Sequence, residues 1–191
     1  MNQRAFTLID LAVLLGVLAI CFVAALIPAL SRSREEARKM KCKSNLRQLG
    51  TGMIQYIDQY GKGAASFNGS QWIASMYWTS LLNEPDLYLC PSSVDDNDYG
   101  GELGRKFTSI RDMDVSYAGR DGRLGVIVDK MPSNTLMMCD DGEYPPNHDD
   151  GVNLLYFDAH VEWSSSVSPR SDGEAGKATI GKDSPVDMQV N

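Results

Sequence analysis

A run of 20 residues without a charged side chain, Leu11–Leu30, constrains this chain more than any other feature of its sequence. The run is rich in Leu, Ala, Val and Ile, and a helix needs about 20 such residues to cross the ~30 Å hydrocarbon layer of a bilayer. Pro28 interrupts the run near its end, where we expect a kink or a locally loosened turn. The sequence therefore predicts a membrane span at about residues 11–30.

Two simpler explanations of this run are a secretory signal peptide and an uncleaved membrane anchor. A signal peptide has an apolar core of about 7–15 residues followed by a small-residue cleavage site, whereas this run is longer and Ala29-Leu30-Ser31 matches such a site poorly. Neither explanation accounts for Asp10, an acid set among apolar residues. A carboxylate near the bilayer interior costs about 2.5–3.5 kcal/mol, so we expect it to have a partner. Arg4 is the nearby cation, but on a helix it lies on a different face from Asp10.

Charge is distributed unevenly along the chain. Residues 1–47 carry a net charge of +5 and the other 144 residues carry −12, which together give the total of −7. A basic segment beside an apolar one, followed by an acidic body, favours a membrane-proximal element and a solvated domain. A nucleic-acid partner is not expected, because such proteins place positive charge on the folded domain.

A second helical pattern follows Pro28. Its apolar residues step by three or four, which puts them on one face of a continuing helix; they are Cys42, Leu46, Leu49, Met53, Ile57 and Tyr60. We therefore predict one helix over residues 6–60, with its second half packed on a sheet. The basic face of residues 32–47 is either a solvated or lipid-facing surface or a contact for acidic surfaces of neighbouring subunits.

The rest of the chain favours strands. Residues 152–163 alternate as a hairpin with a turn at Asp158-Ala159, where Ala in place of the usual Gly is strained because such a turn requires positive φ. Further candidates are strands at Val115–Ala118, Leu124–Val128 and Thr135–Cys139 and a short helix at Gln71–Leu82. One long helix with a run of strands is an α+β arrangement, so we predict a long N-terminal transmembrane or filament helix packed on a small antiparallel sheet. The globular domain is predicted at residues 61–163 and a flexible tail at 164–191, which is rich in Ser, Gly, Asp and Lys.

The N-terminal residues carry a resemblance to a known family. Arg4-Ala5-Phe6-Thr7-Leu8-Ile9-Asp10-Leu11 resembles the signal of type IV prepilins and type II secretion pseudopilins. The resemblance implies a leader of residues 1–5, cleavage between Ala5 and Phe6 by prepilin peptidase, N-methylation of Phe6, and a filament-assembly role for Asp10. In that role Asp10 pairs with the N-terminal amine of a neighbouring subunit. The chain departs from the family in having Ala5 where Gly is usual and Asp10 where Glu is usual.

This resemblance implies a function, partners and a location. The chain is expected to be a structural subunit of a type IV pilus-like or pseudopilus filament, in which it forms a homo-oligomer. Its expected partners are other pilin-like subunits, an inner-membrane assembly platform and membrane lipid. It is expected to cross the bacterial inner membrane once, with a periplasmic or extracellular C-terminal domain. A count of basic residues after the span favours the opposite orientation, and we follow the eight-residue motif. The alternative function is a non-polymerising, membrane-anchored binding module.

Three later segments resemble one subgroup of these proteins, which ends in a His-(nine residues)-Asp-Gly motif. They are the segment from Cys42 to Gly50, the triplet Cys90-Pro91-Ser92, and His148 followed nine residues later by Asp158-Ala159-His160. The resemblance assigns structural roles to a set of motif residues, namely Cys42, Asn45, Leu46, Cys90, Pro91, His148, Asn153, Asp158 and His160.

The four cysteines, at positions 21, 42, 90 and 139, form no Cys-x-x-Cys pair. We expect Cys21 to act as a small apolar residue. One disulfide among Cys42, Cys90 and Cys139 and a set of inert thiols remain equally open.

Candidate sites for chemistry are few. Asp95, Asp96 and Asp98 loosely match the start of a calcium loop, but a solvated acidic loop is the simpler interpretation. His148, Asp158 and His160 have side chains that can bind a metal, but the sequence does not show a third firm ligand. We therefore expect His148 to fix the hairpin by hydrogen bonding rather than to bind metal. The sequence therefore predicts no cofactor, and calcium is the one alternative left open. The chain carries no nucleophile or phosphate-loop motif, so we expect no catalytic activity, although a tethered metal enzyme using His148 and His160 is a third hypothesis.

Overall fold

The computed structural model describes residues 7–60, 69–97, 114–120, 133–140, 147–168 and 188–189. The chain divides into two compact units, Met1–Ala37 and Arg38–Asn191, and each is described by itself. The predicted cleavage pair Ala5 and Phe6, the acid Asp98 and the predicted strand Leu124–Val128 lie outside the described residues.

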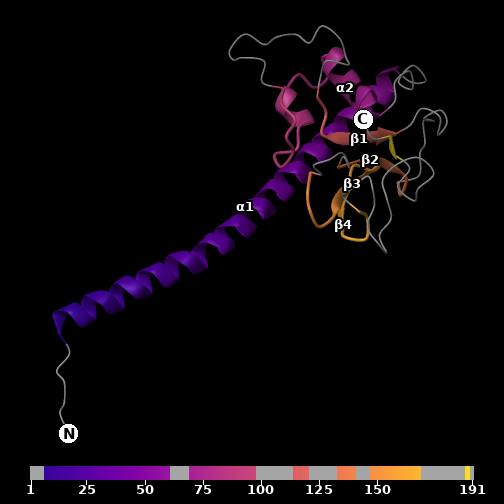
Figure 1. Cartoon of the computed structure of the whole chain (residues 1–191). Helices are drawn as coiled ribbons and strands as arrows, with labels where there is room; N and C mark the ends of the chain where they lie inside the picture. Colours follow the sequence, from indigo (N-terminus) through magenta and orange to yellow (C-terminus); the bar gives the residue numbers. More distant parts are fainter. Residues whose placement is uncertain are drawn as a thin grey trace. The chain divides into compact units, whose positions relative to one another are not determined.

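Helix α1 spans Leu8–Tyr60, a single helix of 53 residues that continues through Pro28 (Figure 1). Its apolar first half is exposed all round, with large side chains such as Leu8, Phe22 and Leu30 more than half exposed. This stretch is long and apolar enough to cross a membrane. One long N-terminal helix was predicted, and the structure confirms it.

The second half of α1 lies in the second unit and is buried along one face. The buried residues are Cys42, Asn45, Leu46, Leu49, Gly50, Gly52, Met53 and Tyr56. This face matches the predicted one through Met53, and the predicted Ile57 is partly buried and packs against the same core, whereas Tyr60 is 42% exposed. At Gly50 an added Cβ atom would lie 2.8 Å from a methyl carbon of Leu155, so glycine permits α1 to pack closely on the sheet.

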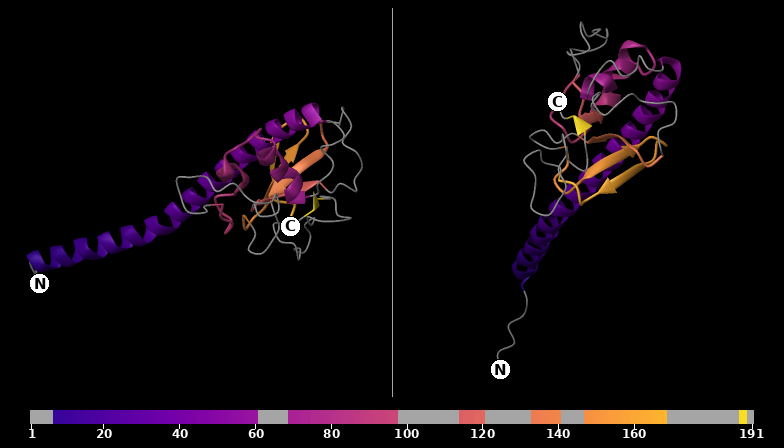
Figure 2. Two further views of the ribbon diagram at one scale, coloured as in Figure 1. Left: turned by 90° about the horizontal axis from the view of Figure 1, so that it is seen from above. Right: turned by 90° about the vertical axis from the view of Figure 1, so that its right-hand side faces the viewer.

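The sheet has five antiparallel strands in the order β4-β3-β2-β1-β5. Its strands lie beside the second half of α1 (Figure 2). Their bounds are β1 Tyr117–Arg120, β2 Leu136–Asp140, β3 Val152–Tyr156, β4 Val161–Ser164 and β5 Met188–Gln189. The predicted hairpin of residues 152–163 is confirmed as β3 and β4, and the predicted strand Thr135–Cys139 corresponds to β2. The first strand begins at Tyr117 rather than Val115, because the backbone N–H groups of Asp114 and Ser116 donate to Asn97 and to the Tyr88 carbonyl instead of to a strand.

Two short helices lie in the described part of the second unit. Helix α2 spans Gly69–Trp78, shifted towards the N-terminus from the predicted Gln71–Leu82, and the 3₁₀ helix η2 spans Pro85–Tyr88. Trp72, Ile73 and Met76 of α2 are fully buried with the apolar face of α1. The fold is therefore α+β, as predicted.

Apolar clusters cover two sides of the sheet. One cluster joins α1, α2 and η2 to sheet residues such as Tyr117, Met138 and Leu155. The other contains Ala118, Cys139, Val152, Leu154 and Val167. Because Val167 is buried there and β5 pairs with β1, the expectation of a flexible tail from residue 164 is wrong for these positions. Composition alone missed them, since tertiary pairing orders short segments whose neighbours are polar.

Candidate functional site

The first candidate site is Asp10, whose side chain caps the start of α1. Its Oδ2 atom accepts hydrogen bonds from the Thr7 backbone N–H at 2.9 Å and the Thr7 hydroxyl at 2.8 Å. The Asp10 N–H in turn donates to the Thr7 hydroxyl at 3.3 Å. This reciprocal pattern is a capping box. Asp10 therefore has partners in its own chain, which corrects the expectation of an unpartnered acid; the partners are neutral, so its negative charge is not compensated by them.

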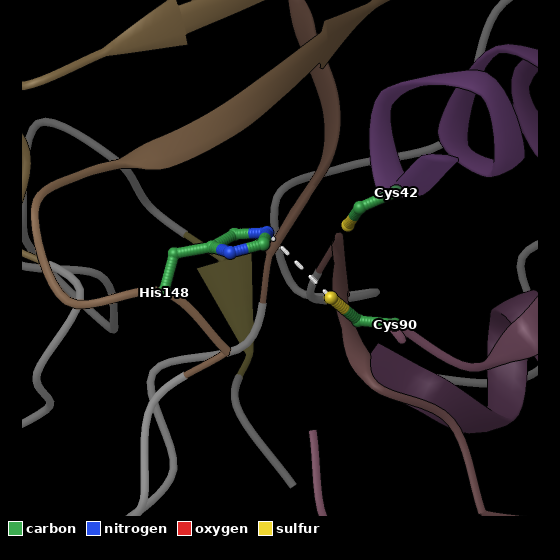
Figure 3. A group of neighbouring side chains, drawn as sticks. All are labelled: Cys42, Cys90 and His148. Carbon is green, nitrogen blue, oxygen red and sulfur yellow. Dashed lines mark hydrogen bonds between the residues drawn. The ribbon is translucent and has the colours of Figure 1, made fainter. Parts of the chain in front are cut away.

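The second candidate site is a cluster of four buried side chains in the second unit, three of which, Cys42, Cys90 and His148, are drawn in Figure 3. Cys42 comes from α1, Cys90 follows η2, Asp140 ends β2, and His148 precedes β3. Each is at most 2% exposed. We call these four residues the thiol–imidazole cluster. Three of them, Cys42, Cys90 and His148, were separate motif residues in the sequence.

The polar atoms of the thiol–imidazole cluster converge on one point. The Sγ and Nε2 atoms of Cys42, Cys90 and His148 all lie within 4.8 Å of one another. The separation between Cys90 Sγ and His148 Nε2 is 3.6 Å (Figure 3). Asp140 lies beside them, with its Oδ2 atom 3.8 Å from His148 Nε2 and its Oδ1 atom accepting from Cys42 Sγ at 2.9 Å.

Neighbouring polar groups hold this cluster in place. Asn153 donates to Asp140 Oδ2 from its backbone N–H at 2.6 Å and from Nδ2 at 2.9 Å. The carbonyl of Leu89, next to Cys90, accepts from the Tyr117 hydroxyl at 3.2 Å and from Asn45 Nδ2 at 3.0 Å. The motif residues Asn45 and Asn153 therefore act as supports of the cluster.

Packing on the histidine side is aromatic. The His148 ring meets the Trp163 ring edge-on, with centroids 5.6 Å apart. The Lys39 ammonium lies 4.6 Å from the centre of the Trp163 ring and pairs with Asp150 at 2.8 Å. The imidazole is thus held among packed side chains, with its Nε2 atom directed at the cluster.

Burial and mutual hydrogen bonding shift the titration of these groups. Burial raises the pKa of Asp140 and, more strongly, that of Cys42. A hydrogen bond from Cys42, followed by one involving His148, lowers the pKa of Cys90 to about 6 despite burial. Cys42 Sγ donates to Asp140 Oδ1 at 2.9 Å and also lies 3.6 Å from the Tyr117 hydroxyl. The cluster therefore favours a thiolate at Cys90 beside a thiol at Cys42.

Thiolate, imidazole and carboxylate are the ligand types that zinc prefers in proteins. Within the thiol–imidazole cluster, Cys42, Cys90 and His148 form the group of three such ligands that the described residues bring together. Each of the four side chains is at most 2% exposed, so none of them presents a surface to a substrate in this structure.

The predicted set of His148, Asp158 and His160 is not formed, because His148 lies in the buried cluster. Asp158 and His160 instead pair with each other in the exposed β3–β4 turn, where Asp158 Oδ1 also accepts from the His160 backbone N–H at 3.1 Å. Ala159 has φ of 64°, which confirms the strained turn predicted from sequence. The predicted hairpin-fixing role therefore falls to Asp158 rather than to His148.

The described calcium candidates and the remaining motif residues lie in hydrogen-bonded segments, in a turn or in the core. Asp95 accepts a hydrogen bond from the Ser116 hydroxyl, and the Asp96 N–H donates to Asp114 Oδ2 at 3.4 Å. Among the described residues these two acids do not gather with a third ligand. Leu46 is part of the main core, and Pro91 lies in a turn.

Sequence reasoning did not connect Asp140, or its neighbour Tyr117, with the cysteines and His148. The local signals were that Asp140 directly follows the predicted strand Thr135–Cys139 and that it opens an acidic run with Asp141 and Glu143, which could bind a cation. All four cysteines are free thiols, so the alternative of a disulfide is not realised here.

Comparison with known proteins gives one match. Residues 31–82 match a family described as a protein of unknown function (DUF1559). The matched segment includes Cys42, Asn45 and Leu46 and extends through α2. Neither the curated proteins nor the solved structures contain a match to the chain.

Proposed function

We propose that this chain is a structural subunit of a type IV pilus-like or type II secretion pseudopilus filament. Prepilin peptidase cleaves it between Ala5 and Phe6, Phe6 is N-methylated, and α1 assembles with α1 of other subunits. The proposed location is the bacterial inner membrane before assembly, with the second unit on the periplasmic or extracellular side. The role is structural and needs no catalytic group.

The observation that carries this proposal is the change of character along α1. Its first half is exposed and apolar on every side, and its second half is buried along one face from Cys42 to Tyr56. A helix that is apolar all round needs lipid or other helices around it. A filament core supplies such helices once the subunit has left the bilayer, and the same helix then supports the folded domain.

Asp10 adds a charge argument to this observation. In the capping box the Asp10 carboxylate accepts two hydrogen bonds from Thr7, and the Asp10 backbone N–H donates one to the Thr7 hydroxyl; none of these partners is a cation. Cleavage before Phe6 creates an amine close to the same end of the helix. In a filament the amine of one subunit pairs with Asp10 of the next, which offsets the cost of a carboxylate in an apolar layer.

The capping box also favours a second candidate, a membrane-anchored binding module that does not polymerise. Helix capping gives Asp10 a purpose within a single chain, so an assembly partner is not required to explain an acid at this position. The two functions differ in what happens to residues 1–5 and in whether the charge of Asp10, rather than its hydrogen-bonding oxygen, is needed.

Mass spectrometry of the mature N-terminus, on chain isolated from its native membrane, tests the proposal. A start at N-methylated Phe6 supports processing by prepilin peptidase. A mature chain that keeps Met-Asn-Gln-Arg-Ala would remove the amine on which assembly depends and leave the binding module as the better account.

A further inference from the structure

We propose that the second unit binds one zinc ion through Cys42 Sγ, Cys90 Sγ and His148 Nε2, with Asp140 as the fourth ligand. This inference goes beyond the filament proposal and does not depend on it. It also departs from the sequence-based expectation that no transition-metal site exists.

The separations between the ligand atoms fit a tetrahedral zinc centre. With zinc bonds of about 2.3 Å to sulfur and about 2.0–2.1 Å to nitrogen, two ligands of a tetrahedron lie roughly 3.5 Å apart. Cys90 Sγ and His148 Nε2 are 3.6 Å apart, and His148 Nε2 and Asp140 Oδ2 are 3.8 Å apart. The three atoms from Cys42, Cys90 and His148 lie within 4.8 Å of one another, so small side-chain rotations suffice to close a shell around an ion.

Orientation of the side chains supports the same assignment. The same nitrogen of His148 faces both Cys90 and Asp140, so the carboxylate lies on the ligand side of the ring. Asn153 holds Asp140 Oδ2 with two hydrogen bonds, while Oδ1 lies next to Cys42. Outer groups that fix ligands in this way are typical of protein metal sites.

Burial of the cluster has an electrostatic cost that a cation reduces. The Asp140 carboxylate and the two thiols are at most 2% exposed, and Cys42 Sγ lies 2.9 Å from Asp140 Oδ1, away from water. A divalent ion bound to both thiolates and the carboxylate offsets two of their three negative charges, and the thiol protons are released to solvent as the metal binds. Sulfur ligands select zinc over calcium and magnesium.

The ligands join four separate segments of the second unit. They come from α1, the residue two positions after η2, the end of β2, and the segment before β3. A zinc ion there cross-links the buried part of α1 to the sheet, so metal binding would stabilise the folded domain. A Cys42–Cys90 disulfide would use the same thiols and is the rival occupant that the experiment must separate.

The test uses the full chain in detergent, reduced, stripped with chelator, and titrated with Zn²⁺ and with Co²⁺. We expect one equivalent of either metal per chain, a thiolate-to-cobalt charge-transfer band with the visible bands of a tetrahedral centre, and X-ray absorption of the zinc form showing two sulfur ligands. Because the last measurement uses the unaltered chain, it does not depend on any variant folding.

Variants then assign the ligands. Cys42→Ser and Cys90→Ser should each remove the charge-transfer intensity of one thiolate and weaken binding by more than the roughly 10–100-fold expected for Asn153→Ala, which removes only an outer contact. Asp140→Asn should weaken binding while leaving both thiolate bands. Cys139→Ser is the matched control, since Cys139 is equally buried but belongs to the other apolar cluster, and it should bind as the unaltered chain does.

Three results would overturn the inference. The first is a folded, reduced chain that takes up neither metal, and the second is a zinc form with fewer than two sulfur ligands. The third is a natively isolated chain that is two hydrogens lighter and yields linked peptides containing Cys42 and Cys90, which would identify the disulfide instead.

Discussion

Asn153 donates two hydrogen bonds to one oxygen of Asp140, from its backbone N–H at 2.6 Å and from its side-chain Nδ2 at 2.9 Å. Both residues are 1% exposed, so water cannot replace either bond. The pair connects β3 to the end of β2 and fixes the carboxylate beside the two thiols.

Removing the Asn153 amide should destabilise the domain. In Asn153→Ala the backbone bond remains and the side-chain bond is lost, which leaves a buried carboxylate under-satisfied at a cost of about 1–3 kcal/mol. Urea unfolding of the reduced, metal-free chain measures this change. Ser166→Ala, an exposed substitution, is the control and should stay within about 0.5 kcal/mol. An unchanged unfolding free energy in Asn153→Ala would contradict the role assigned to this pair.

Substitutions of Asp10 should separate assembly from helix capping. Asp10→Asn keeps an oxygen that accepts the Thr7 N–H but loses the charge, whereas Asp10→Glu keeps the charge. Losing one partner of a buried ion pair costs about 3–5 kcal/mol, enough to lower incorporation into filaments at least about 100-fold. We therefore expect filaments with Glu and none with Asn, scored by electron microscopy and immunoblotting of sheared filaments.

Membrane fractionation provides the control for these variants. All of them should insert into the membrane in normal amounts, because the apolar run is unchanged. Normal filaments from Asp10→Asn would show that capping alone explains the acid.

Replacing the turn residue Ala159 by glycine should stabilise the domain. At φ of 64° an L-residue other than glycine costs about 1–2 kcal/mol, while glycine adds about 0.5–1 kcal/mol of unfolded-state entropy. Ala159→Gly should therefore raise the unfolding free energy by about 0.5–1 kcal/mol. Ala37→Gly, in the exposed part of α1, should instead lower helix stability by about 1 kcal/mol, so a destabilised Ala159→Gly would argue against the strained turn.

The same turn should show a pH dependence. The His160 backbone N–H, followed by the His160 side chain, lowers the pKa of Asp158 below its ordinary value of 3.8. For a carboxyl with a lowered folded-state pKa, the stabilisation is present above 3.8 and is lost as pH falls through the folded value. NMR titration of the Asp158 carboxyl measures this directly.

A variant of His160 gives the matched comparison. In His160→Ala the backbone bond remains and the side-chain bond is lost, so the Asp158 pKa should rise only part of the way to its ordinary value. An Asp158 that already titrates at its ordinary value in the unaltered chain would show that the turn does not hold the carboxylate.

Local patterns in the sequence were enough to predict the main elements. The steps of three and four from Cys42 to Met53 predicted the buried face of α1, and the alternation in residues 152–163 predicted the β3–β4 hairpin. Both patterns reflect contacts that repeat along one element. The exact start of β1 at Tyr117 and the burial of Val167 depend on distant partners, so composition and spacing gave no signal for them.

The thiol–imidazole cluster shows the same limit at the level of a site. Cys42, Cys90 and His148 were each singled out, but nothing in their spacing indicated that they meet. Their approach depends on how η2 and the β2–β3 connection pack against α1, which is a property of the whole core. Asp140 was missed because one acid at a strand end is indistinguishable from a solvated one until its surroundings are known.

The two residues of β5 have a consequence for how this protein can be handled. Met188 and Gln189 occupy the hydrogen-bonding positions beside Arg120 and Gly119, at the outer border of the sheet. A chain shortened ahead of Met188 would leave those backbone groups unpaired and ready to recruit a strand from another molecule. Aggregation of such a truncated chain would then indicate an exposed edge strand, and it should not be mistaken for assembly through α1.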